Sequence, residues 1–375
     1  MVAQKSYANW KLHETKVGCC YPFVTKNPGW KDTRAYNSPD EAMFSPEDLD
    51  SIQLPYILSS FRKSRNATDP RDRVYGMLGL ARSEYENAVV ADYTQSVEMA
   101  FKTAVVQMVS KTGSLEVLSH VVPGLRSPMT VPSYVPDWTS SYKDLHAHFS
   151  WLKWLKDKNE YNACKSTASD LTTFDPGHIQ LKGIEVDEVE MVSSPLGPAL
   201  TPGSLDPLLS LVKRYNERNH DGHQISDTVF WSTICESHGA NRFQKSNRRS
   251  SWPKGPDPAP FERLKAWYSK PAAEFIDDHL HDKDLRIFAD LYQALRTGRK
   301  FEITRTGRLA WCSDFCQEGD KIVIFASGKV PFVLRELGRG NHQFLGDAYV
   351  YGIMDGEAID GLMTGSRAWE NFGLV

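Results

Sequence analysis

The sequence lacks the short motifs from which several classes of enzyme are recognised. It contains no G-x-x-x-x-G-K or G-x-G-x-x-G phosphate-binding loop, no G-x-S-x-G nucleophile turn and no H-E-x-x-H metal site. Nucleotide hydrolysis, hydride transfer, serine hydrolysis and zinc-dependent hydrolysis therefore have no support in the motifs of this chain. We expect the protein to use no cofactor and no metal ion.

Cysteine is scarce, and its spacing is typical of free thiols. The 375 residues include six cysteines, which are Cys19, Cys20, Cys164, Cys235, Cys312 and Cys316. Cys312 and Cys316 are close in sequence, but no second Cys or His pair at zinc spacing accompanies them. We therefore expect buried free thiols, with a metal site at Cys312 and Cys316 as the less favoured alternative.

The chain also has little net charge and no long apolar run. Lys plus Arg number 44 and Asp plus Glu number 47, so the formal net charge is −3, which gives no general attraction to nucleic acid or to an anionic membrane. The basic segment 242–254 is interpreted as a solvated loop. Apolar runs such as residues 322–326 are too short to span a bilayer. The first residues show no secretory signal, so we expect a cytoplasmic protein that binds neither nucleic acid nor membrane.

Residues 69–81 (DPRDRVYGMLGLA) combine charge, a proline turn and an apolar helix. Pro70 fixes its own φ and keeps Asp69 out of the helical region, so Asp69 is expected to cap free N–H groups at a helix start. Asp72 falls in the first turn, where the helix dipole favours a carboxylate. Gly79 is expected to end the helix as a left-handed cap. The apolar positions between them recur on one helix face, namely Val74, Met77 and Leu78.

The two arginines of this segment, Arg71 and Arg73, allow two interpretations. In the first, they form an internal network with Asp69 and Asp72, and these residues together with Tyr75 make a structural signature. In the second, they bind an anion or a substrate, because arginine recognises carboxylate and phosphate with paired hydrogen bonds. We favour the structural interpretation.

Several blocks, in this order, resemble the fungal heterokaryon-incompatibility (HET) domain family. Residues 69–81 resemble the closing signature of the HET domain, and residues 131–138 (VPSYVPDW) resemble its LPSWVPDW region. Further similar blocks are residues 54–65, 91–98, 113–120, 319–320, 331–335 and 344–357. The resemblance implies a role in the growth arrest or death that follows fusion of incompatible fungal cells.

The sequence departs from this family in its opening part. The family's domain usually begins with an LSY.WG block and a WID..CINQ block, and residues 1–50 contain neither. We therefore expect the chain to lack the N-terminal half of the HET domain, which is the part likened to TIR-type signalling folds.

Hydrophobic periodicity predicts an α+β fold. We expect mainly helical N-terminal and middle regions, followed by a C-terminal small antiparallel β-sheet or partial barrel. Helices are expected at residues 46–64, 94–111, 204–218, 226–237 and 261–295. Strands are expected at residues 179–192, 301–304, 309–311, 321–326, 330–336 and 344–351, with glycine-containing turns in the C-terminal part. The helical region carrying the signature is expected to occupy residues 1–140 and the α+β region residues 141–375, with one compact unit as the alternative.

The last of these predicted strands supplies the candidate catalytic residues. Asp347, Tyr349 and Tyr351 alternate and so share one face, and Arg335 ends a neighbouring predicted strand. If this face lines a cavity, it offers hydroxyl donors, a carboxylate and an arginine over apolar walls. Otherwise it is a solvent-facing row with cross-strand partners. We predict Tyr349, Asp347 and Arg335 as catalytic.

Trp138 follows Asp137 at the end of the proline-rich segment 123–136. A tryptophan beside a carboxylate can wall a pocket, or it can simply pack in a core. We predict that Trp138, Asp137 and Tyr351 bind substrate.

Two functions fit these patterns. In the one we favour, a stand-alone HET-like protein is a cofactor-independent natural-product enzyme. It acts on a small apolar terpenoid or polyketide intermediate as a cyclase or isomerase, with a Diels–Alder-type cycloaddition as the most concrete version. Holding a flexible substrate in a reactive conformation is enough for such chemistry. In the alternative, the chain is an incompatibility-type regulatory protein that binds a protein partner and has no catalytic activity.

Overall fold

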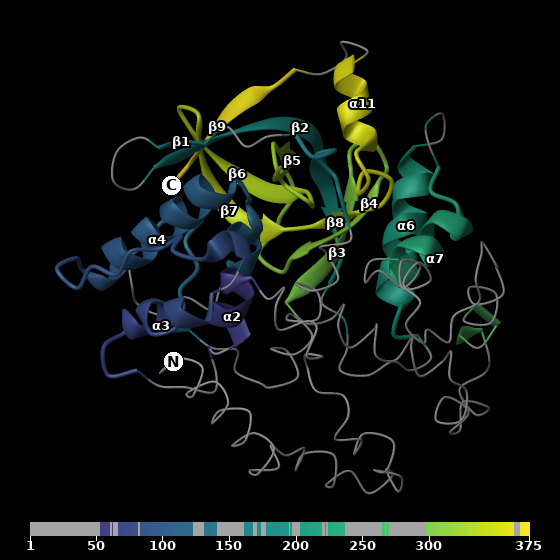
Figure 1. The fold of residues 1–375 in the computed structure, drawn as a ribbon. Helices are drawn as coiled ribbons and strands as arrows, with labels where there is room; N and C mark the ends of the chain where they lie inside the picture. Colours follow the sequence, from purple (N-terminus) through teal and green to yellow (C-terminus); the bar gives the residue numbers. More distant parts are fainter. Residues whose placement is uncertain are drawn as a thin grey trace, which may run out of the picture.

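The computed structural model describes residues 53–60, 62, 67–81, 83–122, 131–140, 161–167, 171–173, 178–194, 196, 203–219, 222, 224–236, 265–266, 268–269, 298–363 and 368–375. Within these ranges, a sheet of nine strands lies between two groups of helices (Figure 1). Helices α2, α3 and α4 lie on one side of the sheet, and α6 and α7 lie on the other.

One long strand, β2 (Ile179–Val192), organises the sheet. Its beginning pairs with β9 (Glu370–Leu374), its middle with β5 (Lys321–Phe325) and its end with β3 (Arg299–Thr304). The register shifts by a residue in the middle and again near the end of β2. Such bulges bend a strand, and here they allow β2 to belong to two parts of the sheet.

The pairings close into a ring, so this part of the chain is a β-barrel. Strand β6 (Phe332–Gly338) pairs with β5 and with β7 (Asn341–Asp347), and β7 runs parallel to β9, which returns to β2. The ring is therefore β2, β5, β6, β7 and β9. Closing a sheet removes its exposed edges.

The remaining strands extend the sheet from β2 through β3. Strand β4 (Leu309–Ser313) pairs with β3, and the short β8 (Tyr349–Val350) pairs with β4. Strand β1 (Leu171–Thr173) pairs with the start of β2. The β3–β4 hairpin is buried on both faces, since Phe301 and Trp311 pack in the larger apolar core while Ala310 and Cys312 pack in a second, smaller one.

Helix α4 (Val97–Thr112) has the amphipathic pattern that the sequence predicts. Ser96 caps its start by accepting a hydrogen bond from the Met99 N–H at 3.2 Å. Gly113 ends it with a φ of 67°, in the left-handed region. The apolar face lies in the larger core and consists of Ala100, Phe101, Ala104, Val105 and Met108.

The signature segment is less helical than predicted. Helix α3 (Asp72–Tyr75) is one turn long, and Gly76 follows it with a right-handed φ of −67°. The chain then enters the 3-10 turn η4 (Leu78–Leu80). Gly79 therefore lies inside a 3-10 turn, and the prediction that it caps a longer helix is wrong. The placement of Asp72 in the first turn is confirmed.

The other helices are short. Helix α2 (Leu54–Ser60) lies near the signature, α6 (Asp206–Arg218) packs on β2 and β3, and α7 (Asp227–Glu236) packs on β4. Helix α11 (Glu357–Met363) precedes the last strand. The predictions at residues 204–218 and 226–237 are confirmed, whereas most of the helix predicted at 261–295 lies outside the described residues.

The fold class is α+β with a C-terminal sheet, as predicted, but the description of the earlier regions as mainly helical is wrong. The described part of residues 53–140 holds one long helix, two short ones and three 3-10 turns. The middle region contributes β2, the strand on which the whole sheet depends. No helix in the described part of the chain is long and apolar enough to cross a membrane.

Candidate functional site

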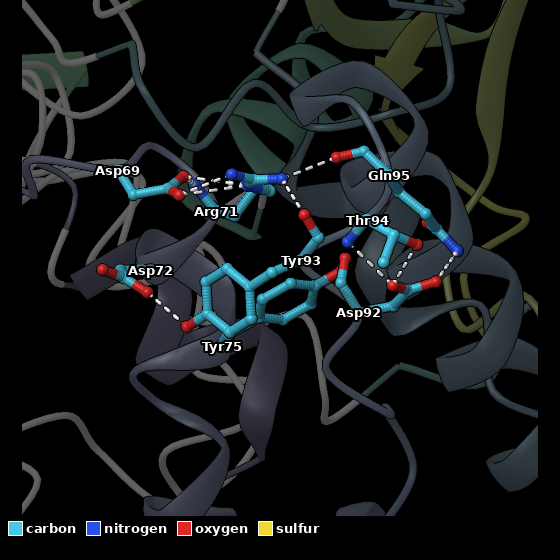
Figure 2. A network of polar contacts seen from close by, with 8 residues as sticks. All are labelled: Asp69, Arg71, Asp72, Tyr75, Asp92, Tyr93, Thr94 and Gln95. Carbon is cyan, nitrogen blue, oxygen red and sulfur yellow. Dashed lines mark hydrogen bonds and ion pairs between the residues drawn. The ribbon is translucent and has the colours of Figure 1, made fainter.

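The signature segment forms a polar network with a second segment, residues 92–95 (Figure 2). Asp69 makes a tight turn by accepting the Arg71 N–H at 2.9 Å, so it does bind a free N–H at the start of the helical turn. The Arg71 side chain then folds back on the same carboxylate, with Nε 3.0 Å from Oδ1 and Nη2 2.7 Å from Oδ2. This is the bidentate arrangement that arginine prefers with carboxylates.

Arg71 also reaches across to the second segment. Its Nη1 donates to the backbone carbonyls of Tyr93 at 2.6 Å and Gln95 at 2.7 Å. The guanidinium lies over the Tyr93 ring, 5.4 Å from the ring centroid. One side chain therefore joins the signature turn to the loop that leads into α4.

Two tyrosines strengthen this junction. The Tyr93 hydroxyl donates to the Asp72 carboxylate at 2.5 Å, and the Tyr75 hydroxyl donates to the Asp92 carbonyl at 3.3 Å. The two rings meet edge to face with centroids 5.2 Å apart. Every residue that the sequence analysis placed in the structural signature, except Arg73, thus contacts the 92–95 loop or its partner Arg71.

The loop has its own internal bonds. The Asp92 carboxylate accepts the Thr94 N–H at 2.9 Å and hydroxyl at 2.6 Å, and the Gln95 amide at 3.1 Å. These bonds lower the pKa of Asp92, and the bonds from Arg71 lower the pKa of Asp69. The Asp69 carboxylate in turn raises the pKa of Arg71. The charged groups are therefore held ionised by one another.

This geometry favours one of the two interpretations of the arginines. Four N–H groups point from the Arg71 guanidinium to the Asp69 carboxylate and two carbonyls, so little of its donor capacity is left for a ligand. Arg73 is directed elsewhere, with Nη1 donating to the Arg62 carbonyl at 3.0 Å. The two side chains have separate partners, and the geometry favours a structural network over an anion site.

Comparison with known proteins finds one domain model and one curated relative that resemble this chain. A sequence model of the Het-6 beta-barrel domain matches residues 273–368, a range that contains β3 to β8. Heterokaryon incompatibility protein 6, OR allele, from Neurospora crassa is 28% identical over 367 residues, which cover 82% of this chain and 51% of the relative. Both comparisons thus find similarity to heterokaryon-incompatibility proteins. It spans about half the length of the curated relative that it matches. No solved structure matches it.

In this HET-like chain, the residues predicted as catalytic have separate partners. Asp347 ends β7 and is buried, and its Oδ1 accepts a hydrogen bond from Arg299 Nη2 at 2.5 Å. Arg335, on β6, pairs with Asp320, with Nε–Oδ1 and Nη2–Oδ2 both 2.9 Å. The structure therefore places the predicted carboxylate and the predicted arginine in two different ion pairs.

The predicted aromatic residues lie mainly in the core. Tyr349, on β8, is buried and packs near Tyr161 with ring centroids 6.0 Å apart. Tyr351 is half-buried against the larger core. The alternative of a solvent-facing row thus does not describe Asp347 and Tyr349, which are both buried. A catalytic role for these residues stays a prediction.

Trp138 and Asp137 also have packing roles. Trp138 is buried and meets Phe101 of α4 edge to face at 5.1 Å. The Asp137 carboxylate accepts the Thr139 N–H at 2.8 Å and hydroxyl at 2.5 Å. These contacts agree with the packing alternative that the sequence left open for Trp138, and substrate binding by the pair stays a prediction.

The sequence analysis did not identify a buried chain of polar side chains between α2 and the 3-10 turn η6 (Glu116–His120). Ser59 Oγ lies 2.5 Å from His120 Nδ1, and His120 Nε2 lies 3.3 Å from Glu116 Oε1. The order hydroxyl, imidazole, carboxylate is that of a catalytic triad. However, all three side chains are buried, so we interpret the chain as a link between two elements. In the sequence, the only indication of this polar chain is that Glu116 and His120 are spaced so that they share one side of a helical turn.

Proposed function

We propose that this chain is a cytoplasmic regulatory protein of the heterokaryon-incompatibility type, which acts by binding a protein partner. The observation that carries the proposal is the similarity to heterokaryon incompatibility protein 6 of Neurospora crassa along 82% of the chain. The match of the Het-6 beta-barrel domain to residues 273–368 supports it independently.

The geometry of the signature supports the same proposal. The charged residues of the 69–81 segment are bonded to one another and to backbone carbonyls. A catalytic arginine would instead keep donors directed at the position of a substrate. The segment is therefore better suited to holding a surface in shape than to transforming a small molecule.

The cyclase prediction receives no comparable support. Its proposed acid–base and polarising groups, Asp347 and Arg335, are each engaged in an ion pair. Neither the domain match nor the relative names any ring-forming chemistry. The regulatory function, which the sequence analysis held as the alternative, is accordingly the one that we propose.

A fusion assay in Neurospora crassa tests the proposal. The chain is expressed from an inducible promoter in one strain, which is fused with a set of strains that differ in incompatibility genotype. Uptake of a vital dye by fused compartments and the growth rate of the resulting heterokaryon are measured. We expect dye uptake and slow growth in at least one pairing, and only when the chain is induced.

The control is the same cassette with a stop codon early in the reading frame. Normal growth of every pairing, at an accumulated protein level verified by immunoblot, would contradict the proposal. In parallel, the purified chain is incubated with terpenoid and polyketide intermediates. Ring formation above the rate without protein would restore the cyclase function.

A further inference from the structure

A cluster of three metal-ligating side chains is buried in the barrel region. Glu302, Cys312 and Cys316 each place one ligand atom so that the three atoms lie within 4.8 Å of one another. The side chains are almost completely inaccessible, with exposed fractions of 0%, 0% and 3%. None of the three belongs to the signature network or to the ion pairs of Asp347 and Arg335.

The β3–β4 hairpin brings these residues together. In its register, Glu302 lies opposite Ala310 and Lys300 lies opposite Cys312, so Glu302 and Cys312 are diagonal neighbours on one face of the hairpin. The chain then turns back, since the Cys316 N–H donates to the Ser313 carbonyl at 2.9 Å. This turn returns the second thiol to the side of the first.

The Glu302 carboxyl group has no ordinary partner in this position. Apart from the nearby Cys312 thiol, neither of its oxygens has a hydrogen-bond partner in the part of the chain that the structure describes, although both are buried. The neighbouring thiols are only weak donors. An unsatisfied buried carboxyl group is costly to a fold, and natural proteins contain few of them. A bound cation would satisfy both oxygens.

The surroundings disfavour negative charge on these three groups when no cation is bound. Burial raises the pKa of Glu302 to about 8 and the charge of Asp320 raises it further, while a hydrogen bond from Cys312 and the charges of Lys300 and Arg299 lower it. Burial and the charge of Glu302 also raise the pKa of both thiols, whereas a hydrogen bond with Cys312 and the charge of Arg335 lower that of Cys316. A divalent cation would remove the desolvation cost of the ionised ligands, because the cation and not the solvent would then compensate their charge.

We propose that Glu302, Cys312 and Cys316 bind a zinc ion that cross-links β3, β4 and the turn after β4. Two thiolates and a carboxylate are ligands that zinc accepts, and soft sulfur ligands favour zinc over magnesium or calcium. Zinc lies about 2.3 Å from sulfur and about 2.0–2.2 Å from a carboxylate oxygen. Ligand atoms at these bond lengths around a tetrahedral ion lie roughly 3.5 Å apart, which is inside the 4.8 Å within which the three atoms lie.

The ion has a structural role in this proposal. The cluster lies in the smaller apolar core with Ala310, Ile322 and Val333, which is no place for a substrate to enter. The three side chains supply three of the four ligands that a tetrahedral zinc ion takes. Binding energy at such a site is folding energy, and it would hold the end of the β3–β4 hairpin against the barrel.

The sequence analysis did not favour a metal site because it looked for a second Cys or His pair. The third ligand is instead a carboxylate on the preceding strand, and only the hairpin register reveals it. Two alternatives to zinc remain for the same atoms. The thiols can form a disulfide bond with each other, or all three groups can stay protonated in the core.

Metal analysis of the purified full chain tests the proposal. The protein is expressed with zinc supplied and dialysed, and its metal content is measured by mass spectrometry of the intact native protein. The zinc is then replaced by Co²⁺, whose thiolate charge-transfer absorption reports cobalt–sulfur bonds. We expect about one ion per chain and an intense charge-transfer band.

Variants assign the ligands. Cys312→Ser, Cys316→Ser and Glu302→Gln are each expected to weaken zinc binding at least about tenfold, as loss of a ligand should exceed the loss of a supporting contact. Cys164→Ser is the matched control, because Cys164 is a buried free thiol of the same core that lies outside the cluster. It is expected to keep both the ion and the band.

Wild-type protein that is folded, holds no zinc and gives no thiolate band with Co²⁺ would overturn the proposal. So would a mass lower by two hydrogens with a Cys312–Cys316 disulfide found by peptide mapping of freshly purified protein. Since these results come from the wild-type chain, the test is decisive even if a variant does not fold.

Discussion

Arg71 and Tyr93 are 22 positions apart in sequence, yet Arg71 Nη1 donates to the Tyr93 carbonyl at 2.6 Å while its guanidinium lies over the Tyr93 ring. The most distinctive segment of the chain is thereby fastened to the loop that leads into α4 (Figure 2). Both segments are among those that resemble the HET family in sequence. Hydrogen bonds join the two segments in both directions, since Arg71 and Tyr75 donate to carbonyls of the 92–95 loop and Tyr93 donates to the Asp72 carboxylate.

Replacing Asp347 by Asn should destabilise the barrel. Asp347 faces Arg299 in an ion pair whose side chains are only 5% and 11% exposed, and removing the negative charge there disfavours the buried arginine. We expect the free energy of unfolding to fall by about 3 kcal/mol, measured by urea denaturation. A purely catalytic aspartate would show no such loss.

The control for this substitution is Asp360→Asn. Asp360 pairs with Lys165 at the surface, where the two side chains are 59% and 42% exposed. We expect a change below about 1 kcal/mol there. Equal effects of the two substitutions would contradict the distinction that we draw between a buried and an exposed pair.

His342 should make stability depend on pH. The ring is buried against Phe372, and burial lowers its pKa below the usual value, with Lys321 acting in the same direction and Glu336 in the opposite one. The unfolded chain therefore takes up a proton near pH 6.5 that the folded chain does not. Stability contributed by the neutral ring is complete above about pH 6.5 and is lost as the pH falls from there toward the lower folded pKa.

The variant His342→Gln isolates this contribution. The free energy of unfolding of wild type and variant is measured between about pH 7.5 and about pH 5.5. We expect the wild type to lose more stability than the variant over this range. A difference between the two proteins that stays constant with pH would show that His342 is not the group responsible.

Two glycines with left-handed backbones offer a matched pair of substitutions. Gly307 has a φ of +79°, and an added Cβ would lie 2.9 Å from the hydroxyl of Tyr215 on α6, whereas Gly298 has a φ of +67° and nothing within 4 Å. Alanine at either position carries a backbone cost of about 1–2 kcal/mol. We expect Gly307→Ala to lower the free energy of unfolding by roughly 1 kcal/mol more than Gly298→Ala does, and therefore to give the lower melting temperature of the two variants. Equal melting temperatures would mean that α6 does not pack closely on the β3–β4 turn.

The sequence predicted the elements whose pattern is local. The alternation at residues 179–192 correctly predicts β2, and the apolar face of α4 follows from its spacing. The strands β1 and β9 and the helix α11 were not predicted. Strand β9 is only five residues long and joins the barrel through a parallel pairing with β7, which no local pattern reveals.

The candidate site shows the same limit. The bond from Asp69 to the Arg71 N–H could be expected from Asp before Pro, because the turn is made by neighbouring residues. The two backbone carbonyls that accept hydrogen bonds from the Arg71 side chain could not be predicted. Every residue has such a carbonyl, so the sequence does not show which ones lie near the guanidinium. The prediction that Arg335 and Asp347 share a site assumed that neighbouring strands bring them together. In the observed register, Arg335 lies opposite Gln343 and Asp347 lies opposite Phe332.

The substitution Arg71→Ala tests most directly whether the signature works through the fold. The melting temperature of the purified variant and its dye uptake in the Neurospora crassa fusion assay are measured together, with Arg305→Ala, at a 65% exposed side chain, as the control. We expect Arg71→Ala to melt several degrees lower and to lose its fusion response in proportion to the loss of folded protein. An unchanged melting temperature with an abolished response would contradict this account, and would make Arg71 a functional contact in its own right.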